Sequence, residues 1–159
     1  MDSQCFTNFP MEVKILDKEA YQDVEVLQKG TLGSAGLDLR VCLDKDFLNI
    51  YPNQVVLVGT GLAIHIADSS FVGLIVPRSG KGHTKGLIIG NLTGVIDSDY
   101  QGELKISLWN RGEQVITVYP GEAVAQLLIV PLGKPIITIV EEFSTPTSRG
   151  GNGFGSTGG

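Results

Sequence analysis

One stretch of this sequence, ELKISLW at residues 103–109, decides the expected fold. Apolar and polar side chains alternate along it without a break, which is typical of a strand with one face in the core and the other exposed. Residues 37–43 and 62–66 repeat this alternation. Short apolar runs bounded by Gly, Pro or Asn predict further core strands at 55–58, 71–76, 87–89, 115–118, 124–130 and 136–140. We therefore expect about ten short strands in all.

Composition points to the same fold class. Val, Ile and Thr together supply 39 of the 159 residues, whereas Ala supplies only 6, a balance that favours strands over helices. Helical spacing appears only in residues 16–27, which lack a good N-cap, so we expect no more than a turn or two of helix there. Many short strands separated by Gly and Pro, with no βαβ rhythm, predict an all-β fold, either a closed barrel or a two-sheet jelly roll.

Length and charge limit the possible organisation. A chain of 159 residues has the usual size of one domain. Charged residues make up 18% of it, below the ~25% of an average soluble chain, so much of this chain must pack inside a core or against a partner, and an oligomer is plausible. The net charge of −5 repels nucleic acid and anionic lipid, so neither is an expected partner. Any anionic ligand must therefore meet a local basic cluster.

Location follows from the apolar segments and the cysteines. No apolar stretch approaches the ~20 residues that cross a bilayer, and the N-terminus does not resemble a secretory signal, so we expect a cytoplasmic protein without a membrane partner. Cys5 and Cys42 are both expected to be free thiols, because a cytoplasmic chain with a proper core needs no disulfide. Cys42 has aliphatic neighbours, which favours a buried structural thiol over a nucleophile.

The C-terminal composition predicts an arm. The main β domain is expected to span residues 1–143, with 1–10 as a disordered extension, and residues 144–159 are rich in glycine. A tail of this composition cannot build a core of its own, so the simplest interpretation is a disordered end. However, the tail also holds Arg149, Phe154 and a Ser-Thr pair, which suit a segment that folds over an anionic nucleotide. We therefore expect a flexible arm that closes over an active site.

Two loops carry the residues best suited to chemistry. Residues 77–86, PRSGKGHTKG, follow a predicted strand and set basic side chains among small residues that expose backbone N–H groups, as in a phosphate cradle. They do not match a Walker A loop, and a solvated basic loop is an equally good interpretation of this stretch alone. In the polar segment 90–102, Asn91 has the donor and the acceptor needed to read a base edge. Asp97 and Asp99 in the same segment either share a face as carboxylates or simply shape a turn.

Other kinds of catalytic site find little support. His65 and His83 are the only histidines, and neither stands at metal-ligand spacing from a cysteine or from the other, so a zinc site is not expected. The sequence also lacks the G-x-S-x-G pattern of serine hydrolases. The carboxylates, amides and hydroxyls that remain suit a hard, oxygen-liganded ion such as Mg²⁺, carried in by phosphates.

Five short motifs stand out when the whole chain is considered. They are AGLDLR at 35–40, PRSG at 77–80, GVIDSDYQGELKISLWN at 94–110, GEAVAQL at 121–127 and RGGNGFGSTG at 149–158. In this order and spacing they resemble the trimeric deoxyuridine triphosphatases (dUTPases), which hydrolyse dUTP to dUMP and pyrophosphate, and the bacterial form most closely. One such motif would be weak evidence, but five in sequence leave little room for chance. In the last motif Asn152 stands where the family usually has glycine, which affects how readily the arm closes.

The resemblance implies a jelly-roll-like, distorted β-barrel, the β-clip fold of dUTPases, assembled as a homotrimer. Its active sites would lie at subunit boundaries and use residues from more than one chain. The groups that read uracil would be Asn91, the backbone of Gly94, Val95 and Ile96, and main chain of Lys105 across the hairpin. Tyr100 would lie against the deoxyribose, in the space that a 2′-hydroxyl would need.

The resemblance also assigns the phosphate, metal and catalytic roles. The phosphates would be held by Arg78, Ser79, Gly80 and Gln126, and by Arg149, Gly155, Ser156 and Thr157 of the arm, while Phe154 covers the base. Mg²⁺ would be chelated mainly by the substrate phosphates, with Asp38 accepting hydrogen bonds from its water ligands. Asp97 would be the general base for the water that attacks the α-phosphorus. Such an activity limits uracil incorporation into DNA and supplies dUMP for thymidylate synthesis.

The sequence alone leaves functions other than dUTP hydrolysis to be considered. The related dCTP deaminases share the β architecture, but they need a glutamate base at the pyrimidine, where this chain has Asp97 in IDSDY. A nucleotide-responsive binding protein could instead use the same scaffold to bind a partner; release of pyrophosphate from dUTP separates it from an enzyme. A trimeric structural protein would have no use for Asn91, Asp97 and Tyr100 together with Arg149.

Overall fold

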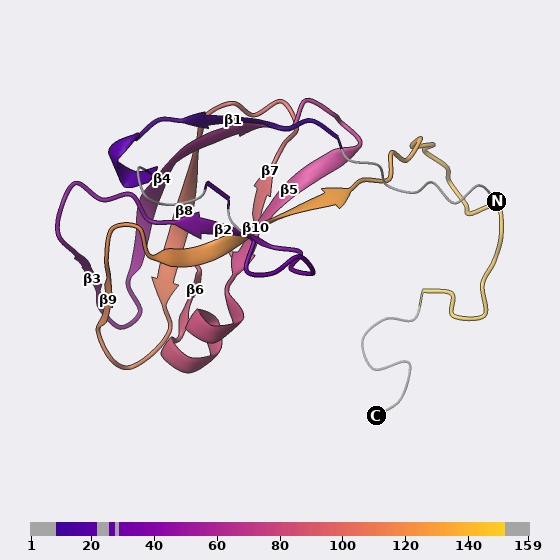
Figure 1. Ribbon diagram of the computed structural model, residues 1–159. Coiled ribbons are helices and arrows are strands. Elements are labelled where there is room, and N and C mark those ends of the chain that lie inside the picture. The colour runs from indigo at the N-terminus through magenta and orange to yellow at the C-terminus, as the bar shows by residue number, and fades with distance from the viewer. Residues whose placement is uncertain (1–8, 22–25, 28, 152–159) are drawn as a thin grey trace.

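The computed structural model describes residues 9–21, 26–27 and 29–151, in which the chain forms two antiparallel four-stranded sheets (Figure 1). In spatial order, the first sheet contains β1 (Glu12–Ile15), β4 (Val55–His65), β8 (Glu103–Asn110) and β6 (Leu87–Ile89). The second contains β2 (Leu37–Arg40), β10 (Ala123–Pro131), β5 (Phe71–Pro77) and β7 (Gly94–Ile96). A small two-stranded sheet pairs β3 (Leu48–Ile50) with β9 (Ile116–Val118). The described residues thus confirm the prediction of an all-β fold.

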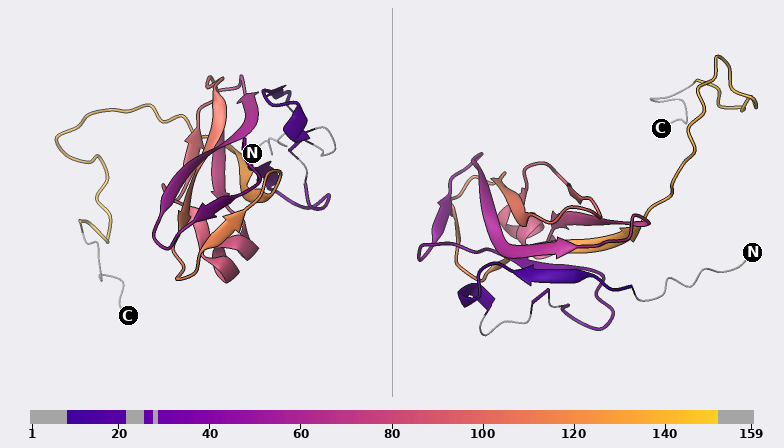
Figure 2. Two further views of the ribbon diagram at one scale, coloured as in Figure 1. Left: turned by 90° about the vertical axis from the view of Figure 1, so that its left-hand side faces the viewer. Right: turned by 90° about the horizontal axis from the view of Figure 1, so that it is seen from above.

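The core is one cluster of buried aliphatic side chains supplied by both sheets. The alternation that the sequence shows at 103–109 places Leu104, Ile106 and Leu108 of β8 in this cluster, each at most 1% exposed. Ile75 of β5 and Leu127 of β10 join them from the second sheet. Figure 2 shows strands of both sheets wrapped around this core. Truncating any of these side chains to alanine would cost about 2–5 kcal/mol of stability.

Most predicted strands are confirmed, and the differences reflect local pairing. The two strands predicted at 55–58 and 62–66 form the single strand β4, whose pairing with β8 shifts register between Gly59 and Ala63. Gly61 has a φ of 66°, so an irregularity of the β-bulge kind bends the strand there without ending it. The strands β1, β3 and β7 were not predicted. The residues around β1 do alternate (MEVKI, 11–15), whereas Asn49 interrupts β3 and Gly94 begins β7, so neither of these two is a continuous apolar run.

The predicted core strand at 136–140 is wrong. Its residues form no strand, and Ile136 and Ile139 are 96% and 97% exposed. After β10 the chain, orange to yellow in Figures 1 and 2, leaves the body, and residues 131–151 are all exposed. An apolar run becomes a core strand only beside a sheet edge that can pair with it, and none of the described strands pairs with this one.

The helical elements among the described residues are η1 (Glu19–Tyr21), a 3-10 turn, and η2 (Lys81–Lys85), a short π-helix that continues the helical backbone of Ser79 and Gly80. The turn η1 agrees with the small amount of helix predicted for residues 16–27. The sequence pattern did not predict an N-cap for this turn. In the structure Asp17 is the cap, because its Oδ1 accepts hydrogen bonds from the backbone N–H groups of Glu19 (3.0 Å) and Ala20 (3.2 Å). No helix in the described ranges is long and apolar enough to span a membrane.

Cys42 is a free thiol with a structural role. It lies just beyond β2, half-buried, and its Sγ donates to Asp17 Oδ2 at 2.8 Å. Burial, together with the hydrogen bond to Asp17 and its negative charge, raises the pKa of Cys42 to about 12, so the thiol stays protonated at neutral pH. A protonated thiol is a poor nucleophile, as expected from the sequence. Cys5 lies outside the described residues.

Candidate active site

Three neighbouring strands bring the first, second and fourth sequence motifs together. Gln126 of β10 lies opposite Asp38 of β2 on one side and opposite Val76 of β5 on the other. Arg78 follows directly after β5, and its Nε lies 3.2 Å from Asp38 Oδ1. Its Nη1 donates to the carbonyl of Ala123 at 3.3 Å. We call this group the Arg78 cluster: Asp38, Arg78, Ser79, Gly80 and Gln126.

Close packing fixes the polar groups of the Arg78 cluster. Gln126 Nε2 donates to the carbonyl of Pro77 at 3.0 Å. A Cβ at Gly36 would overlap the side-chain amide of Gln126, so glycine at this position lets that amide keep its place beside Pro77. The side chain of Arg78 is 38% exposed, and a guanidinium carries five N–H donors, so it can hold Asp38 and still bind an anion.

Ser79 and Gly80 form the exposed part of the Arg78 cluster. They lie between β5 and η2, in a turn closed by the N–H of Gly82, which donates to the carbonyl of Arg78 at 2.9 Å. The carbonyl of Gly80 accepts from Thr84 Oγ1 at 2.5 Å. The turn therefore presents a hydroxyl and backbone N–H groups beside a guanidinium, an arrangement that suits phosphate oxygens.

The third motif builds a second group, the Asp97 cluster, which comprises Asn91, residues 94–97 and Tyr100. Its strand β7 pairs with β5, so that Gly94 lies opposite Ile75. After β7 the chain turns: the N–H of Tyr100 donates to the carbonyl of Asp97 at 3.2 Å, and its hydroxyl donates to the carbonyl of Glu103 at 2.9 Å. A Cβ at Gly102 would overlap the Tyr100 ring, so glycine is required against that ring.

The functional groups of the Asp97 cluster face outward. Asp97 is exposed and lines a surface hollow of about 600 Å³ together with Asp99 and His65. Both carboxylates therefore border the same hollow, and the turn from Asp97 to Tyr100 places both residues at a turn, as the second of the two sequence interpretations expects. Asn91 and Tyr100 are also exposed, and Tyr100 keeps 43% of its surface accessible. Exposed polar groups around a hollow are available to a ligand.

The structure corrects the expected position of Lys105. The predicted hairpin would pair Lys105 with residues 94–96, but β7 and β8 belong to different sheets. Lys105 pairs with Gly59 of β4, while β7 pairs with the edge of β5. The sequence could not distinguish these pairings, because any strand near β7 in sequence is a candidate partner. A contact between Lys105 main chain and a base stays a prediction.

Asp97 and Arg78 lie towards opposite ends of β5, whereas Gly94 of the Asp97 cluster pairs with Ile75, closer to the Arg78 end. Asp97 follows Ile96, which pairs with Gly73 near the start of β5, whereas Arg78 comes after its last residue. The strand has seven residues, which corresponds to about 20 Å at roughly 3.3 Å per residue. Figure 1 shows β7 and the helix that follows β5 at opposite ends of the body. One chain therefore keeps Asp97 well separated from the guanidinium of Arg78.

The last motif lies mostly outside the described residues. Arg149 lies within a turn that is closed by the N–H of Gly150, which donates to the carbonyl of Thr147 at 3.1 Å. This turn belongs to the exposed segment that leaves the body after β10. The other predicted arm residues, Phe154, Gly155, Ser156 and Thr157, lie beyond the described part of the chain, as does Asn152.

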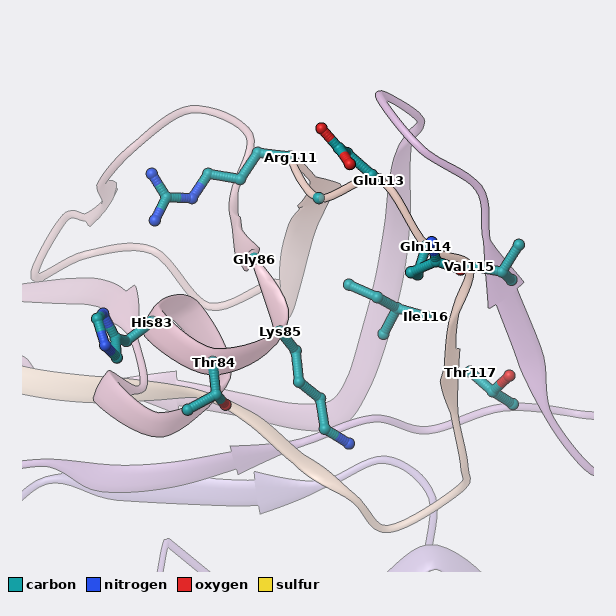
Figure 3. Close-up of a pocket in the computed structure, with 11 residues that line it drawn as sticks. His83, Thr84, Lys85, Gly86, Arg111, Glu113, Gln114, Val115, Ile116 and Thr117 are labelled. Atoms are coloured by element: carbon teal, nitrogen blue, oxygen red, sulfur yellow. The ribbon is translucent and has the colours of Figure 1, made fainter.

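Another hollow of about 600 Å³ lies between η2 and residues 111–117 (Figure 3). None of the predicted site residues lines it. Its basic side chains do not converge: in Figure 3 Lys85 points away from Arg111 and His83. A site for an anion needs several donors directed at one point, so this hollow is not the active site.

The donor set fits a metal ion that arrives with its substrate. Among the described residues, no group of three or more His, Cys, Asp or Glu side chains could hold a metal by itself. Asp38 is half-buried and gives one carboxylate oxygen to Arg78. A carboxylate accepts several hydrogen bonds, so Asp38 can also accept from water molecules of a hydrated ion. These residues fit an ion whose inner ligands are phosphates and waters.

Comparison with known proteins identifies the family. A family model described as dUTPase matches residues 22–158. The chain belongs to the dUTPase family. Among its bacterial relatives, the deoxyuridine 5′-triphosphate nucleotidohydrolase of Hydrogenovibrio crunogenus is 50% identical over 148 residues, or 93% of this chain and 96% of the relative. The protein of the same name from Acinetobacter baylyi is 53% identical over 93% of this chain and 97% of its own length. The resemblance drawn from the five motifs is thus confirmed.

Solved dUTPase structures also share the fold. The dUTPase of Staphylococcus bacteriophage 80alpha, determined with dUpNHpp, superposes with a TM-score of 0.82 at 28% identity, covering 95% of this chain and 99% of that one. The dUTPase of phage phi11 of S. aureus matches with a TM-score of 0.74 at 24% identity, over 86% of this chain and 99% of that one. The prediction of a jelly-roll-like dUTPase fold is confirmed.

Proposed function

We propose that this chain hydrolyses dUTP to dUMP and pyrophosphate. Membership of the dUTPase family supports the proposal, as do bacterial relatives named deoxyuridine 5′-triphosphate nucleotidohydrolase. One observation carries it furthest: Asp38, Arg78 and Gln126, from three separate motifs, meet across three adjacent strands. In the cell, this reaction would limit the uracil incorporated into DNA and supply dUMP for thymidylate synthesis.

The active site is proposed to form between subunits of a homotrimer. The distance along β5 supports this, because one chain cannot bring Asp97 to a phosphate bound at Arg78. A second copy can place its own Asp97 cluster there. The exposed apolar side chains of residues 136–140 and of Leu57 on β4 give such an oligomer surface to bury.

The Asp97 cluster would recognise the nucleoside. The backbone of Gly94, Val95 and Ile96 would read uracil together with the amide of Asn91, and with main chain of Lys105. Fixed donors and acceptors reject cytosine, and a tight backbone leaves no room for the methyl group of thymine. The Tyr100 ring would lie against the deoxyribose and exclude a ribose hydroxyl.

The Arg78 cluster would bind the phosphates. Arg78 supplies a fork of donors, Ser79 and Gly80 supply hydroxyl and N–H groups, and Gln126 adds its amide. Mg²⁺ would neutralise the charge of the triphosphate and fix its conformation. Asp38 would hold the ion's water ligands in its outer shell. The arm, residues 144–159, would close the site, with Arg149, Gly155, Ser156 and Thr157 on the phosphates and Phe154 over the base.

Asp97 would act as the general base. It would remove a proton from a water molecule whose oxygen attacks the α-phosphorus. The bond between the α-phosphorus and the bridging oxygen then breaks, and pyrophosphate leaves with that oxygen. The water oxygen stays on dUMP, and Asp97 afterwards releases the proton to solvent.

The proposal is tested by measuring pyrophosphate release from dUTP, dCTP, dTTP and UTP. We expect rapid release from dUTP alone, with each of the other three nucleotides slower by at least ~100-fold. A nucleotide-responsive binding protein would bind dUTP without releasing pyrophosphate. A dCTP deaminase would release ammonia from dCTP. Either of these results would contradict the proposed function.

A further inference from the structure

Lys81, a basic residue close to Arg78, has no role in the reaction proposed above. Lys81 follows Gly80 directly, and its Nζ forms an ion pair with Glu122 Oε1. The side chains of Lys81 and Glu122 are only 20% and 22% exposed, so the pair is largely shielded from the solvent that weakens surface ion pairs. The pair joins the start of η2 to the turn before β10, 41 residues further along the chain.

Glu122 is held in place independently of Lys81. Its Oε2 accepts a hydrogen bond from the backbone N–H of Tyr119 at 3.0 Å, and its carbonyl accepts from the N–H of Val41 at 3.0 Å. The next residue, Ala123, accepts from Arg78 Nη1 at 3.3 Å. Two consecutive residues, Glu122 at the end of the turn and Ala123 at the start of β10, therefore hold the cations on both sides of the Ser79–Gly80 segment.

The charges explain why such a pair is needed. Burial, and the nearby positive charges of Lys85 and Arg78, lower the pKa of Lys81. Those like charges repel one another, and Glu122 offsets the repulsion because its carboxylate contacts Lys81 directly. Without the carboxylate, Arg78 would keep its contacts with Asp38 and Ala123, but we expect the segment after it to shift away from β10 and to carry Ser79 and Gly80 with it.

We propose that Lys81 and Glu122 are a positioning pair that holds Ser79 and Gly80 in the conformation that receives the β- and γ-phosphates of the substrate. This inference rests on the proposed hydrolysis of dUTP. Lys81 stays on Glu122 throughout and does not contact the nucleotide. Loss of the pair should therefore weaken triphosphate binding far more than monophosphate binding, while the chemistry at the α-phosphorus continues.

The test compares Lys81→Met with Lys85→Met, which removes the same charge from the same helix at an exposed lysine. For Lys81→Met we expect KM for dUTP and Kd for dUpNHpp to rise about tenfold, while kcat and the affinity for dUMP change by less than about twofold. For Lys85→Met all four values should stay within about twofold of wild type.

Glu122→Gln provides the second arm of the test. Glutamine keeps an oxygen for the N–H of Tyr119 but loses the charge, so we expect the same selective rise in KM as in Lys81→Met. The double variant should be no weaker than either single variant, because both remove one interaction. Lys81→Arg should restore most of the affinity for dUpNHpp.

Several results would overturn the positioning pair. Equal effects of Lys81→Met and Lys85→Met would mean that only net charge matters. A parallel loss of dUMP affinity and melting temperature would mean a general structural role. If Glu122→Gln behaved like wild type, the charge of Glu122 would not be what positions Lys81. If the wild-type chain itself fails to hydrolyse dUTP, the proposed function fails instead, so the two failures are distinguishable.

Discussion

At the scale of single residues, the proposed chemistry depends most on the carboxylate of Asp97. Asp97→Asn keeps the size and the turn-forming ability of the residue but removes its basic oxygen. We expect turnover of dUTP to fall by ~10²- to 10⁴-fold, or about 3–5.5 kcal/mol of barrier, while dUpNHpp still binds. Pyrophosphate release and calorimetric titration measure the two quantities. Near-wild-type turnover would mean that Asp97 only shapes a turn and is not the general base.

Hydrolysis in water enriched in heavy oxygen provides the control for the position of attack. Water activated at the α-phosphorus leaves the label in dUMP, whereas attack at the β-phosphorus leaves it in pyrophosphate. Mass spectrometry of the products separates the two cases. A label found only in pyrophosphate would exclude the proposed role of Asp97 even if the variant were inactive.

Because of Cys42, we expect the free energy of unfolding to decrease as the pH rises in the alkaline range. Folding raises the thiol pKa from 9.0 to about 12, so the unfolded chain releases this proton at a lower pH than the folded chain. The stabilisation is fully present below pH 9 and is lost as pH rises towards 12. We expect the free energy of unfolding of wild type, relative to Cys42→Ser, to drop by about 1 kcal/mol between pH 8 and 10, after allowing for partial exposure.

Urea unfolding of both proteins at several pH values measures this difference. Cys5 is present in both and cancels in the comparison. The pKa of Tyr21 is raised to about 12 by burial and by the neighbouring Cys42, so its loss at higher pH differs between the two proteins, and the comparison is restricted to pH 10 and below. Identical pH profiles for wild type and Cys42→Ser would show that the Asp17–Cys42 contact does not favour the thiol.

At the scale of elements, the approach of the segment before β2 to β10 can be tested with two glycines. A Cβ at Gly36 would overlap the amide of Gln126, whereas a Cβ at Gly33 meets nothing within 4 Å. We expect Gly36→Ala to displace Gln126 from Pro77 and raise KM for dUTP about tenfold, with Gly33→Ala close to wild type. Steady-state kinetics and melting curves measure both effects. Equal KM values for the two variants would contradict the packing described for Gln126.

The same scale shows what the sequence could reveal about the fold. Strict alternation identified β8, because each buried leucine or isoleucine there is followed by an outward side chain. The short apolar run at 136–140 was misleading, because these residues have the apolar content of a core strand but pair with none of the described strands. Neither signal identified β7, which begins with a glycine inside a polar segment and whose partner β5 only the tertiary fold determines.

The residues of the candidate site also differ in whether the sequence could predict them. The motifs identified Asp38, Arg78 and Gln126, and the register of β2, β10 and β5 brings them together. Lys81 and Glu122 gave no such signal, because a lysine and a glutamate 41 residues apart carry no local pattern. Opposite charges in two neighbouring loops are informative only once the strands that join them are known to pair.

At the scale of the whole molecule, the C-terminal arm is expected to serve catalysis but not folding. Residues 131–151 are exposed and add no strand to the body. A chain that ends at Phe143 should therefore fold and assemble like wild type, yet lose most dUTP turnover, by about 100-fold, because Arg149 and Phe154 are missing. Circular dichroism, sedimentation and pyrophosphate release test the three points. Full activity of the shortened chain would exclude the proposed role of the arm.

The positions of Asp97 and Arg78 towards opposite ends of β5 predict complementation between subunits. A homotrimer should sediment at about three times 17.0 kDa, and each of its sites would combine Arg78 of one chain with Asp97 of another. Arg78→Ala and Asp97→Asn chains should each be nearly inactive alone. Co-expressed in equal amounts, they should recover about a quarter of wild-type activity, because random assembly joins an intact Arg78 to an intact Asp97 in about one site in four. If both residues served a site within their own chain, every mixed trimer would contain only damaged sites. Verified mixed trimers that stay inactive, or a monomer that hydrolyses dUTP, would contradict the shared site.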